Sequence, residues 1–261
     1  MNLAHSPEDL AFREEVRAFC AAQVPDTLRA RVRAGLRPTP KQFREWQDIL
    51  YRQGWGAPSW PREHGGQARS PREQLAFMEV MERAEAPRAG AAVQVNALLM
   101  HGTAEQRARY LPEILCGEAM HGMGYSEPEA GSDLASLRTS AVLSEDGREW
   151  ILNGQKIWTT TYWGEYMLLA ARTDPDAKPA HAGISMFVVP MKTPGITIRT
   201  SQTMYGGTFA NVFYDDVRVD DDALLGPLHG GWTVLTSALA TERGFIGGGI
   251  VMKVARSFEL L

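Results

Sequence analysis

The first segment of this chain with residues suited to chemistry is a loop at residues 124–133, whose sequence is GYSEPEAGSD. Gly131 lacks a Cβ atom, so a flat ligand could approach the backbone closely at that point. Ser126 offers a hydroxyl, and backbone N–H groups beside it can face a developing negative charge. Taken alone, the loop favours a plainer interpretation, a tight connection in which Ser132 or Asp133 caps a short helix.

A second segment, residues 153–160, reads NGQKIWTT and presents a tryptophan beside two hydroxyls. Asn153 and Gly154 predict a two-residue hairpin turn, because both residue types tolerate a positive φ. Trp158 follows, and its planar indole suits packing against a flat ring such as an isoalloxazine. Two residues on, Thr160 is predicted to point to the same face of the strand, where its hydroxyl can bond the ring edge. In isolation the segment also fits a core tryptophan beside β-favouring threonines.

A carboxylate that could act as a base lies near the end of the chain, at Glu242. It follows Leu235 and Leu239 at helical spacing, which predicts a helix face shared with them. Burial beside an apolar group raises the pKa of a carboxylate and makes it a competent general base. The alternative is a solvent-exposed side chain, because glutamate is rarely buried without a partner.

Two other clusters suggest chemistry without supporting it. Residues 247–249 are glycines, but no strand precedes them, so close helix packing is predicted rather than phosphate binding. Glu127, Glu129 and Asp133 resemble an acid–base or metal cluster, and loop capping is the interpretation favoured for them. The histidines are scattered and include no HExxH-like pair, which argues against a metal centre.

Composition indicates the class of protein in which these segments work. The 261 residues are 44% hydrophobic and 22% charged, as in an ordinary soluble globular protein of two or three packed units. A net charge of −4 gives no reason to expect nucleic acid as a partner. Cys20 and Cys116 have no metal-type spacing, which favours a reducing, cytoplasmic setting. We expect no secretion signal and no membrane span, because no apolar run is long enough.

The first part of the chain has the pattern of helices. Helix starts are predicted at Ser6, at residues 70–73 and at residues 103–106. At each, a serine or threonine that can cap a helix is followed three residues later by an acidic or amide side chain, and at the first two a proline comes directly after the cap. Apolar residues at helical spacing predict two core-facing stripes: Phe12, Val16 and Phe19 in one, Phe43, Trp46 and Leu50 in the other. These signals predict an N-terminal helical domain over residues 1–120.

From about residue 121 the pattern changes to short strands separated by turns. Strand-like runs lie at residues 138–143, 149–152, 166–171, 184–189, 196–199 and 209–219. They predict a middle β domain, a barrel or sandwich, over residues 121–228. The helical period returns at Trp232, so residues 229–261 are predicted to form the first helix of an incomplete C-terminal helical domain. The expected fold class is therefore α+β.

The order of these segments resembles that of the acyl-CoA dehydrogenase family: N-terminal helices, the GYSEPEAGSD loop, then NGQKIWTT. Further matches lie at residues 101–106, 171–174 and 213–219. The resemblance extends from about Ser6 to the last residue, and its two central motifs are specific in combination. It implies bound FAD and αβ-dehydrogenation of an acyl-CoA thioester, in which a carboxylate removes the α-proton and the β-hydride passes to flavin N5.

The resemblance also implies roles for individual residues. Glu242 matches the position of the base in the isovaleryl and long-chain branches of the family, and Arg243 matches an arginine near the substrate. Ser126 would hydrogen-bond the flavin near N1 and O2, and Ser132 would lie where the pantetheine arm of the substrate passes. The residues implied to line the flavin are Met123, Tyr125, Ser126, Gly131, Ser132, Trp158, Thr159 and Thr160.

The chain departs from the family in length, because family members usually continue past this length into a helical bundle that contacts FAD of a neighbouring subunit. We therefore expect either a fragment or one half of a two-chain enzyme, within a homo- or hetero-oligomer (dimer or tetramer). The expected partners are an acyl-CoA substrate and an electron-transfer flavoprotein as acceptor. Two alternatives stay open: a flavin-dependent monooxygenase of the same fold, and a catalytically incomplete structural subunit.

Overall fold

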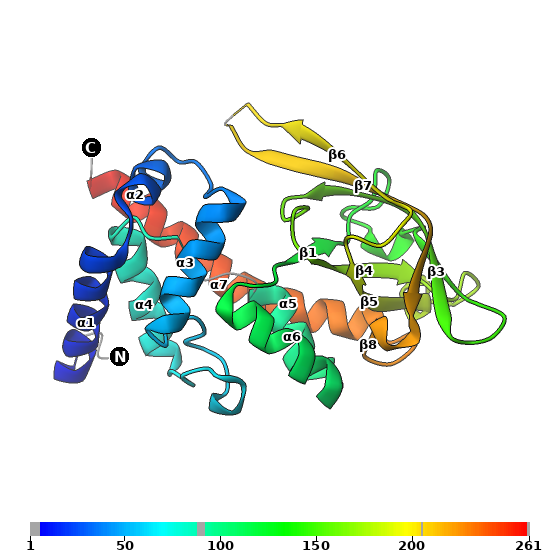
Figure 1. Ribbon diagram of the computed structural model, residues 1–261, viewed down its shortest axis with the longest axis horizontal. Helices are drawn as coiled ribbons and strands as arrows, with labels where there is room; N and C mark the ends of the chain where they lie inside the picture. The colour runs from blue at the N-terminus through cyan, green and yellow to red at the C-terminus, as the bar shows by residue number, and fades with distance from the viewer. Residues whose placement is uncertain (1–5, 88–91, 205, 260–261) are drawn as a thin grey trace. The chain divides into compact units, whose positions relative to one another are not determined.

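The computed structural model describes the backbone of residues 6–87, 92–204 and 206–259 (Figure 1). Side chains are described over the same ranges except at residues 92, 93, 241–250, 253, 256, 257 and 259. The chain divides into two compact units. The first comprises Met1–Gly90, Leu115–Glu118 and Glu242–Leu261, and the second comprises Ala91–Ile114 and Ala119–Thr241. Both sequence motifs therefore lie in the second unit.

Most helices in the N-terminal part of the first unit start at a residue whose side chain caps the helix. The helices are α1 (Pro7–Gln23), α2 (Asp26–Arg33), α3 (Pro40–Arg52), α4 (Pro71–Arg83) and the short 3₁₀ turn η1 (Arg62–His64). Ser6, Thr39 and Ser70 each accept a hydrogen bond from the backbone N–H three residues on, and the side chain of that residue bonds back. The helix starts predicted at Ser6 and Ser70 are confirmed.

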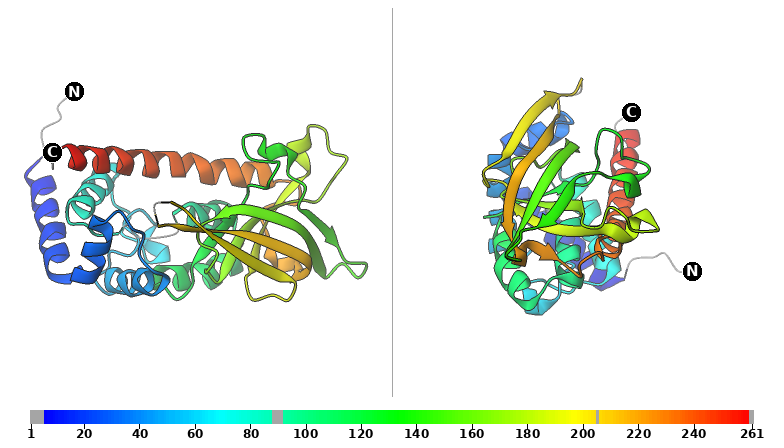
Figure 2. Two further views of the ribbon diagram at one scale, coloured as in Figure 1. Left: turned by 90° about the horizontal axis from the view of Figure 1, so that it is seen from above. Right: turned by 90° about the vertical axis from the view of Figure 1, so that its right-hand side faces the viewer.

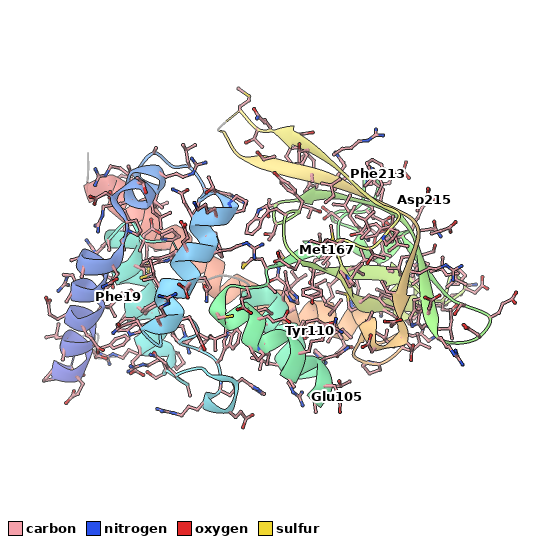
Figure 3. All side chains as sticks on the ribbon, in the orientation of Figure 1. Phe19, Glu105, Tyr110, Met167, Phe213 and Asp215 are labelled. Carbon is pink, nitrogen blue, oxygen red and sulfur yellow. The ribbon has the colours of Figure 1, made fainter. Side chains whose placement is uncertain are left out.

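A cluster of aromatic rings forms the core of the first unit. Trp55 stacks on Phe12 and Phe19, with ring centroids 5.9 and 5.3 Å apart; Phe19 is labelled in Figure 3. Trp46 is buried beside them and donates its indole N–H to a backbone carbonyl at 2.8 Å. The two predicted stripes are confirmed as core-facing, although Phe43 is only half-buried.

Helices α5 (Ala92–His101) and α6 (Ala104–Cys116) precede the first motif in the chain. Thr103 and Gln106 exchange reciprocal hydrogen bonds of 3.1 Å, which confirms the capping box predicted there. Gln106 also donates its amide N–H to the carbonyls of Asp222 and Leu224 at 2.7 and 2.9 Å. The start of α6 is therefore attached to the end of the sheet.

Eight strands form one sheet in the described part of the second unit (Figures 1 and 2). They are β1 (His121–Gly124), β2 (Ser140–Leu143), β3 (Glu149–Thr159), β4 (Tyr166–Arg172), β5 (Ile184–Pro190), β6 (Ile196–Gln202), β7 (Thr208–Asp220) and β8 (Leu224–Leu225). Neighbours follow the order β6-β7-β3-β2-β4-β5-β8, and β1 pairs in parallel with β4. Every predicted strand-like run corresponds to one of these strands.

The sheet folds over so that its two halves share one core. Trp150 on β3 contacts Phe187 on β5 with ring centroids 5.4 Å apart, although β2 and β4 lie between those strands in the sheet order. The buried cluster takes residues from β3 and β7 on one side and from β4 and β5 on the other, including Met167 (Figure 3). The expected α+β class, with a helical first part and a middle β domain, is confirmed.

Helix α7 (Gly231–Glu259) follows the sheet and confirms the helical period predicted from Trp232. Its first turns bury Val234, Leu235 and Ala238. Among the described residues, none of the helices has the length and apolar character needed to cross a membrane.

The hairpin predicted at Asn153 and Gly154 is wrong, because β3 runs straight through both residues. Asn153 exchanges two hydrogen bonds of 2.9 Å with Asp216 of β7. A Cβ atom at Gly154 would lie 2.5 Å from Oγ1 and 2.7 Å from Cα of Thr139, so glycine permits close packing here. Gly154 does have a positive φ of 152°, but it adopts this angle within a strand, beside a break in the β3–β7 register.

Candidate functional site

The first motif is a compact turn directly after β1. The backbone groups of Glu127 and Ala130 pair at 2.9 and 3.2 Å and close a two-residue turn between them. Tyr125 before the turn is buried, whereas Met123 on β1 and Ser126 are half-buried. The turn therefore holds Ser126 at a fixed place with part of its surface accessible.

The rest of the first motif is open to solvent. Gly131, Ser132 and Asp133 are exposed, and a Cβ atom added at Gly131 would meet no heavy atom within 4 Å in the part of the chain that is described. A 3₁₀ turn, η2 (Leu134–Ser136), follows, but Asp133 at its N-cap position makes no capping bond with its side chain. The capping predicted for Asp133 is therefore wrong, and the space beside Gly131 is open to a ligand.

The second motif ends β3 at an irregularity. Trp158 has a φ of +60°, an unusual conformation for a bulky residue, and is 61% exposed. Its indole lies against Phe209 of β7, with ring centroids 4.6 Å apart. Thr159 is buried at the last strand position, and Thr160 just beyond it is exposed. The strand end therefore presents an indole and a hydroxyl to the outside on either side of a buried threonine.

Consecutive residues of β3 join the two motifs directly. The backbone N–H of Ile157 donates to the carbonyl of Ser126 at 2.9 Å. The ammonium group of Lys156 donates to the carbonyl of Tyr125 at 3.0 Å and to Oε1 of Glu127 at 2.8 Å. The loop and the strand end are therefore held side by side by three bonds.

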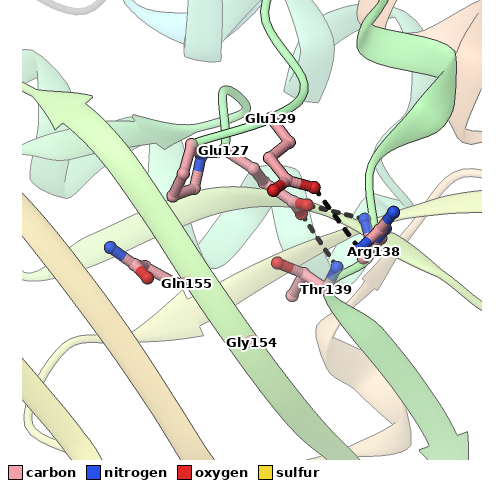
Figure 4. A pocket seen from close by; sticks show the side chains of 7 residues that line it. Glu127, Glu129, Arg138, Thr139, Gly154 and Gln155 are labelled. Carbon is pink, nitrogen blue, oxygen red and sulfur yellow. Dashed lines mark hydrogen bonds and ion pairs between the residues drawn. The ribbon is translucent and has the colours of Figure 1, made fainter.

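Lys156 and Glu127 form an ion pair sealed from solvent, with side chains 0% and 8% exposed. Glu127 also accepts the backbone N–H groups of Arg138 and Thr139 at 2.6 and 2.8 Å (Figure 4). Burial lowers the pKa of Lys156 to about 8, although the charge of Glu127 acts in the opposite direction. Burial raises the pKa of Glu127, but the charge of Lys156 and these hydrogen bonds outweigh it, so the pKa is lowered.

The capping role predicted for Glu127 is confirmed, because its carboxylate accepts the backbone N–H groups of Arg138 and Thr139. The sequence patterns did not indicate its buried partner, Lys156. The two partners are 29 positions apart in the chain, and no periodicity links a loop residue to a strand residue. The one available signal is a lysine set among strand-forming residues, in QKIW, at a position whose side chain turns out to be inward.

A small open pocket of about 290 Å³ lies beside Glu127 (Figure 4). Its lining residues are Glu127, Pro128, Glu129, Arg138, Thr139, Gly154 and Gln155. Glu129 and Arg138 form an exposed ion pair among them at 3.4 Å. Neither Ser126 nor Trp158 lines this pocket, so it is separate from the surface that the motifs predict for a flavin.

The surface around Trp158 fits a flat group with polar edges, such as the flavin of FAD. The exposed indole offers a stacking face, and Ser126 and Thr160 carry hydroxyls on the two adjoining segments. Thr159 Oγ1 is buried and has no hydrogen-bond partner among the residues that the structure describes. A buried hydroxyl without a partner suits completion by a ligand, and Thr139 Oγ1 beside Glu127 is in the same condition.

The predicted base and its neighbour belong to α7. The helix includes the backbone of Glu242 and Arg243, which are part of the first unit. Their side chains lie outside the described residues. The roles of both residues stay predictions.

Comparison with known proteins places these features in a family. Residues 6–118 match the acyl-CoA dehydrogenase N-terminal domain, and residues 122–217 match the acyl-CoA dehydrogenase middle domain. Acyl-CoA dehydrogenase FadE26 of Mycobacterium tuberculosis is 36% identical over 250 residues, which are 93% of this chain and 62% of that protein. The chain thus spans less than two thirds of the length of this curated relative.

Solved structures agree with the sequence matches. The Tcur3481-Tcur3483 steroid ACAD is 36% identical with a TM-score of 0.89, covering 99% of this chain and 67% of that one. The ChsE4-ChsE5 complex from Mycobacterium tuberculosis is 35% identical with a TM-score of 0.80, covering 92% of this chain and 61% of that one. With two family domains matched in order and both motifs in place, this chain belongs to the acyl-CoA dehydrogenase family.

Proposed function

We propose that this chain forms a FAD-binding site in an enzyme that dehydrogenates acyl-CoA thioesters between Cα and Cβ. The observation that carries the proposal is the direct joining of the loop at Ser126 to the strand end at Trp158. This junction presents an exposed indole at a strained backbone position next to a partly accessible hydroxyl. Strained residues of this kind concentrate at binding and catalytic sites.

In this proposal the indole of Trp158 packs on the flavin ring, and the hydroxyls of Ser126 and Thr160 bond its edges. The open surface at Gly131 and Ser132 admits the pantetheine arm of the substrate. The full set of proposed flavin-lining residues is Met123, Tyr125, Ser126, Gly131, Ser132, Trp158, Thr159 and Thr160. The chemistry that FAD would supply when bound is the two-electron oxidation of the acyl chain.

Glu242 is the proposed base for the α-proton, and Arg243 the proposed substrate contact. The thioester carbonyl acidifies the α-carbon, and a carboxylate with a raised pKa can then accept the proton. Support comes from spacing: α7 includes both Leu235, which is buried, and Glu242, and a separation of seven residues, about two helical turns, is that of residues on one helix face. The proposed division of the chain is a helical domain over 1–120, a β domain over 121–228 and a helix over 229–261, in line with the two family matches.

A second chain is proposed to complete the enzyme. Two of the solved relatives carry paired names, Tcur3481-Tcur3483 and ChsE4-ChsE5, and the latter is called a complex. We infer a hetero-oligomer for this chain, with a homo-oligomer as the alternative and an electron-transfer flavoprotein as acceptor in the cytoplasm. Because one relative is named a steroid ACAD, a steroid acyl-CoA is the first substrate class to test.

The experiment is an absorbance spectrum of the purified chain, alone and co-expressed with the product of a neighbouring related gene. We expect a flavin band in at least one preparation, and its bleaching when steroid acyl-CoA is added without oxygen. Glu242→Gln should keep the band and lose the bleaching, whereas Glu259→Gln, at another glutamate of the same helix, should change neither. Undiminished bleaching in Glu242→Gln would overturn the role of Glu242.

The second candidate function is a structural subunit, which the paired names of two solved relatives favour because they point to assemblies of two different chains. It predicts that no preparation holds flavin in this chain, even when the partner chain is active. Bleaching that requires NAD(P)H and consumes oxygen would instead favour a monooxygenase of the same fold.

A further inference from the structure

The buried ion pair grips the loop at the two residues that flank Ser126. Lys156 bonds the carbonyl of Tyr125 before it and the carboxylate of Glu127 after it, at 3.0 and 2.8 Å. The next residue of β3, Ile157, bonds the carbonyl of Ser126 itself at 2.9 Å. Two consecutive strand residues therefore fix three consecutive loop residues.

The same stretch of β3 leads directly into the exposed indole. Trp158 follows Ile157 directly in the chain and has an unusual φ of +60°, so the direction of its indole changes if the backbone of Lys156 and Ile157 moves. A displacement of Lys156 would therefore move the loop hydroxyl and the indole relative to each other. The two proposed walls of the flavin site share this single anchor.

Stability alone does not account for an ion pair in this place. Removing two charges from water costs several kcal/mol each, and buried pairs are often replaceable by apolar residues without loss of stability. What such a pair does provide is direction, because a charged donor bonds only where its acceptors lie. Here the acceptors of the ammonium group are both on the cofactor-facing loop.

We propose that Lys156 is a positioning residue of the flavin site, which, with Glu127, holds the Ser126 loop in register with the Trp158 strand end. The inference rests on the proposed function, since the ligand so positioned is FAD. Lys156 itself is fully buried and touches loop atoms only, so its action on the flavin is indirect.

The test compares the variant Lys156→Met/Glu127→Gln with wild type in two measurements. Hydrogen exchange at the Ile157 amide, in flavin-free protein, reports whether the loop is docked on the strand. Titration with FAD, followed by flavin fluorescence, reports affinity. The double variant removes both charges, so no buried charge is left unpaired, and glutamine keeps an acceptor for the backbone N–H groups of residues 138 and 139.

We expect the double variant to unfold near the wild-type temperature, to exchange the Ile157 amide faster, and to bind FAD roughly tenfold more weakly or worse. Arg218→Met/Glu149→Gln is the matched control, because it removes an exposed ion pair of 3.0 Å that also has one member on β3, the other being on β7. Val219→Ala, a core truncation at the far end of β7, controls for lowered stability. Neither control should change FAD affinity.

The outcomes separate this inference from the function on which it rests. Wild-type protein that binds FAD, with unchanged affinity in Lys156→Met/Glu127→Gln, would overturn the positioning role alone. Wild-type protein that binds no FAD, alone or with its partner chain, would overturn the proposed function and this inference with it. An equal loss of affinity in Val219→Ala and in the double variant would assign the effect to stability and overturn the positioning role.

Discussion

Two bulges interrupt the pairing of β3 with β7, and they differ in the type of residue that takes the unusual backbone conformation and in how that residue is held. At the first, two steps along β3 from Leu152 to Gly154 oppose three along β7, so the extra residue is on β7. At the second, three steps from Lys156 to Thr159 oppose two on β7, so the extra residue is on β3. Each carries a residue with positive φ: Asp216 at 46° in the first and Trp158 at 60° in the second.

The first bulge is closed by its own residues. Asp216 is a type that tolerates a positive φ, and its backbone N–H and carboxylate both bond Asn153 at 2.9 Å. The second bulge puts a bulky aromatic residue in the same conformation and leaves it 61% exposed. A buried hydroxyl without a partner among the described residues lies beside each bulge, Thr139 at the first and Thr159 at the second. A closed bulge shapes the sheet, whereas a strained and exposed one is the kind that is enriched beside binding sites.

The largest effect on stability is expected from Gly154→Ala, which breaks the closed bulge. The new Cβ atom would lie within 2.8 Å of three atoms of Thr139, and the φ of 152° is one that alanine rarely adopts. Overpacking and backbone strain together should cost about 2–5 kcal/mol. Urea unfolding of the variant measures this loss directly.

Gly147→Ala provides the matched control for that substitution. Gly147 also has a positive φ, 70°, but no heavy atom of the described residues lies within 4 Å of its Cβ position. Its expected cost is the conformational one alone, about 1 kcal/mol. Equal losses in the two variants would mean that Thr139 makes way and that the first bulge is not tightly closed.

The acid dependence of stability is expected to reflect the pair at the second bulge. Because the pKa of Glu127 is lowered in the folded chain, its contribution is present above about pH 4.5 and is lost as pH falls through the lowered value. Lys156→Met/Glu127→Gln should therefore lose less stability than wild type between pH 7 and pH 3, by about 1–2 kcal/mol. Urea unfolding at several pH values gives the two curves, and parallel curves would contradict the expectation.

Asn153→Ala is expected to have a smaller effect, confined to the closed bulge. It removes both hydrogen bonds to Asp216, which are exposed to solvent, so about 1 kcal/mol of stability should be lost. FAD affinity should stay at the wild-type value, because both of these side-chain hydrogen bonds go to Asp216 on β7 and neither goes to the Ser126 loop. A clear loss of FAD affinity would show that the two bulges act together.

The two bulges also show which structural features of this molecule can be predicted from the sequence and which cannot. Helix starts such as Ser6 and Ser70 follow from residues three positions apart, and strand runs follow from alternation, so both are read locally. Asn153-Gly154 carries the strongest local hairpin signal, yet β3 continues through it because Asp216, distant in sequence, bonds Asn153 within the sheet. The pair of Lys156 and Glu127 escapes prediction for the same reason, since only the fold brings its members together.

Trp158→Asn should change stability least and test the open bulge most directly. Asparagine tolerates a positive φ, and the indole is mostly exposed, so unfolding free energy should stay within about 0.5 kcal/mol of wild type or rise. FAD affinity should nevertheless fall by roughly tenfold, because the stacking face is lost. Urea unfolding and flavin titration on the same preparation measure both quantities. A loss of stability above about 1 kcal/mol would mean that the packing of Trp158 on Phe209, with ring centroids 4.6 Å apart, stabilises the second bulge. The second bulge would then be held by its own residues, as Asn153 holds the first, and the contrast between the two bulges would be wrong.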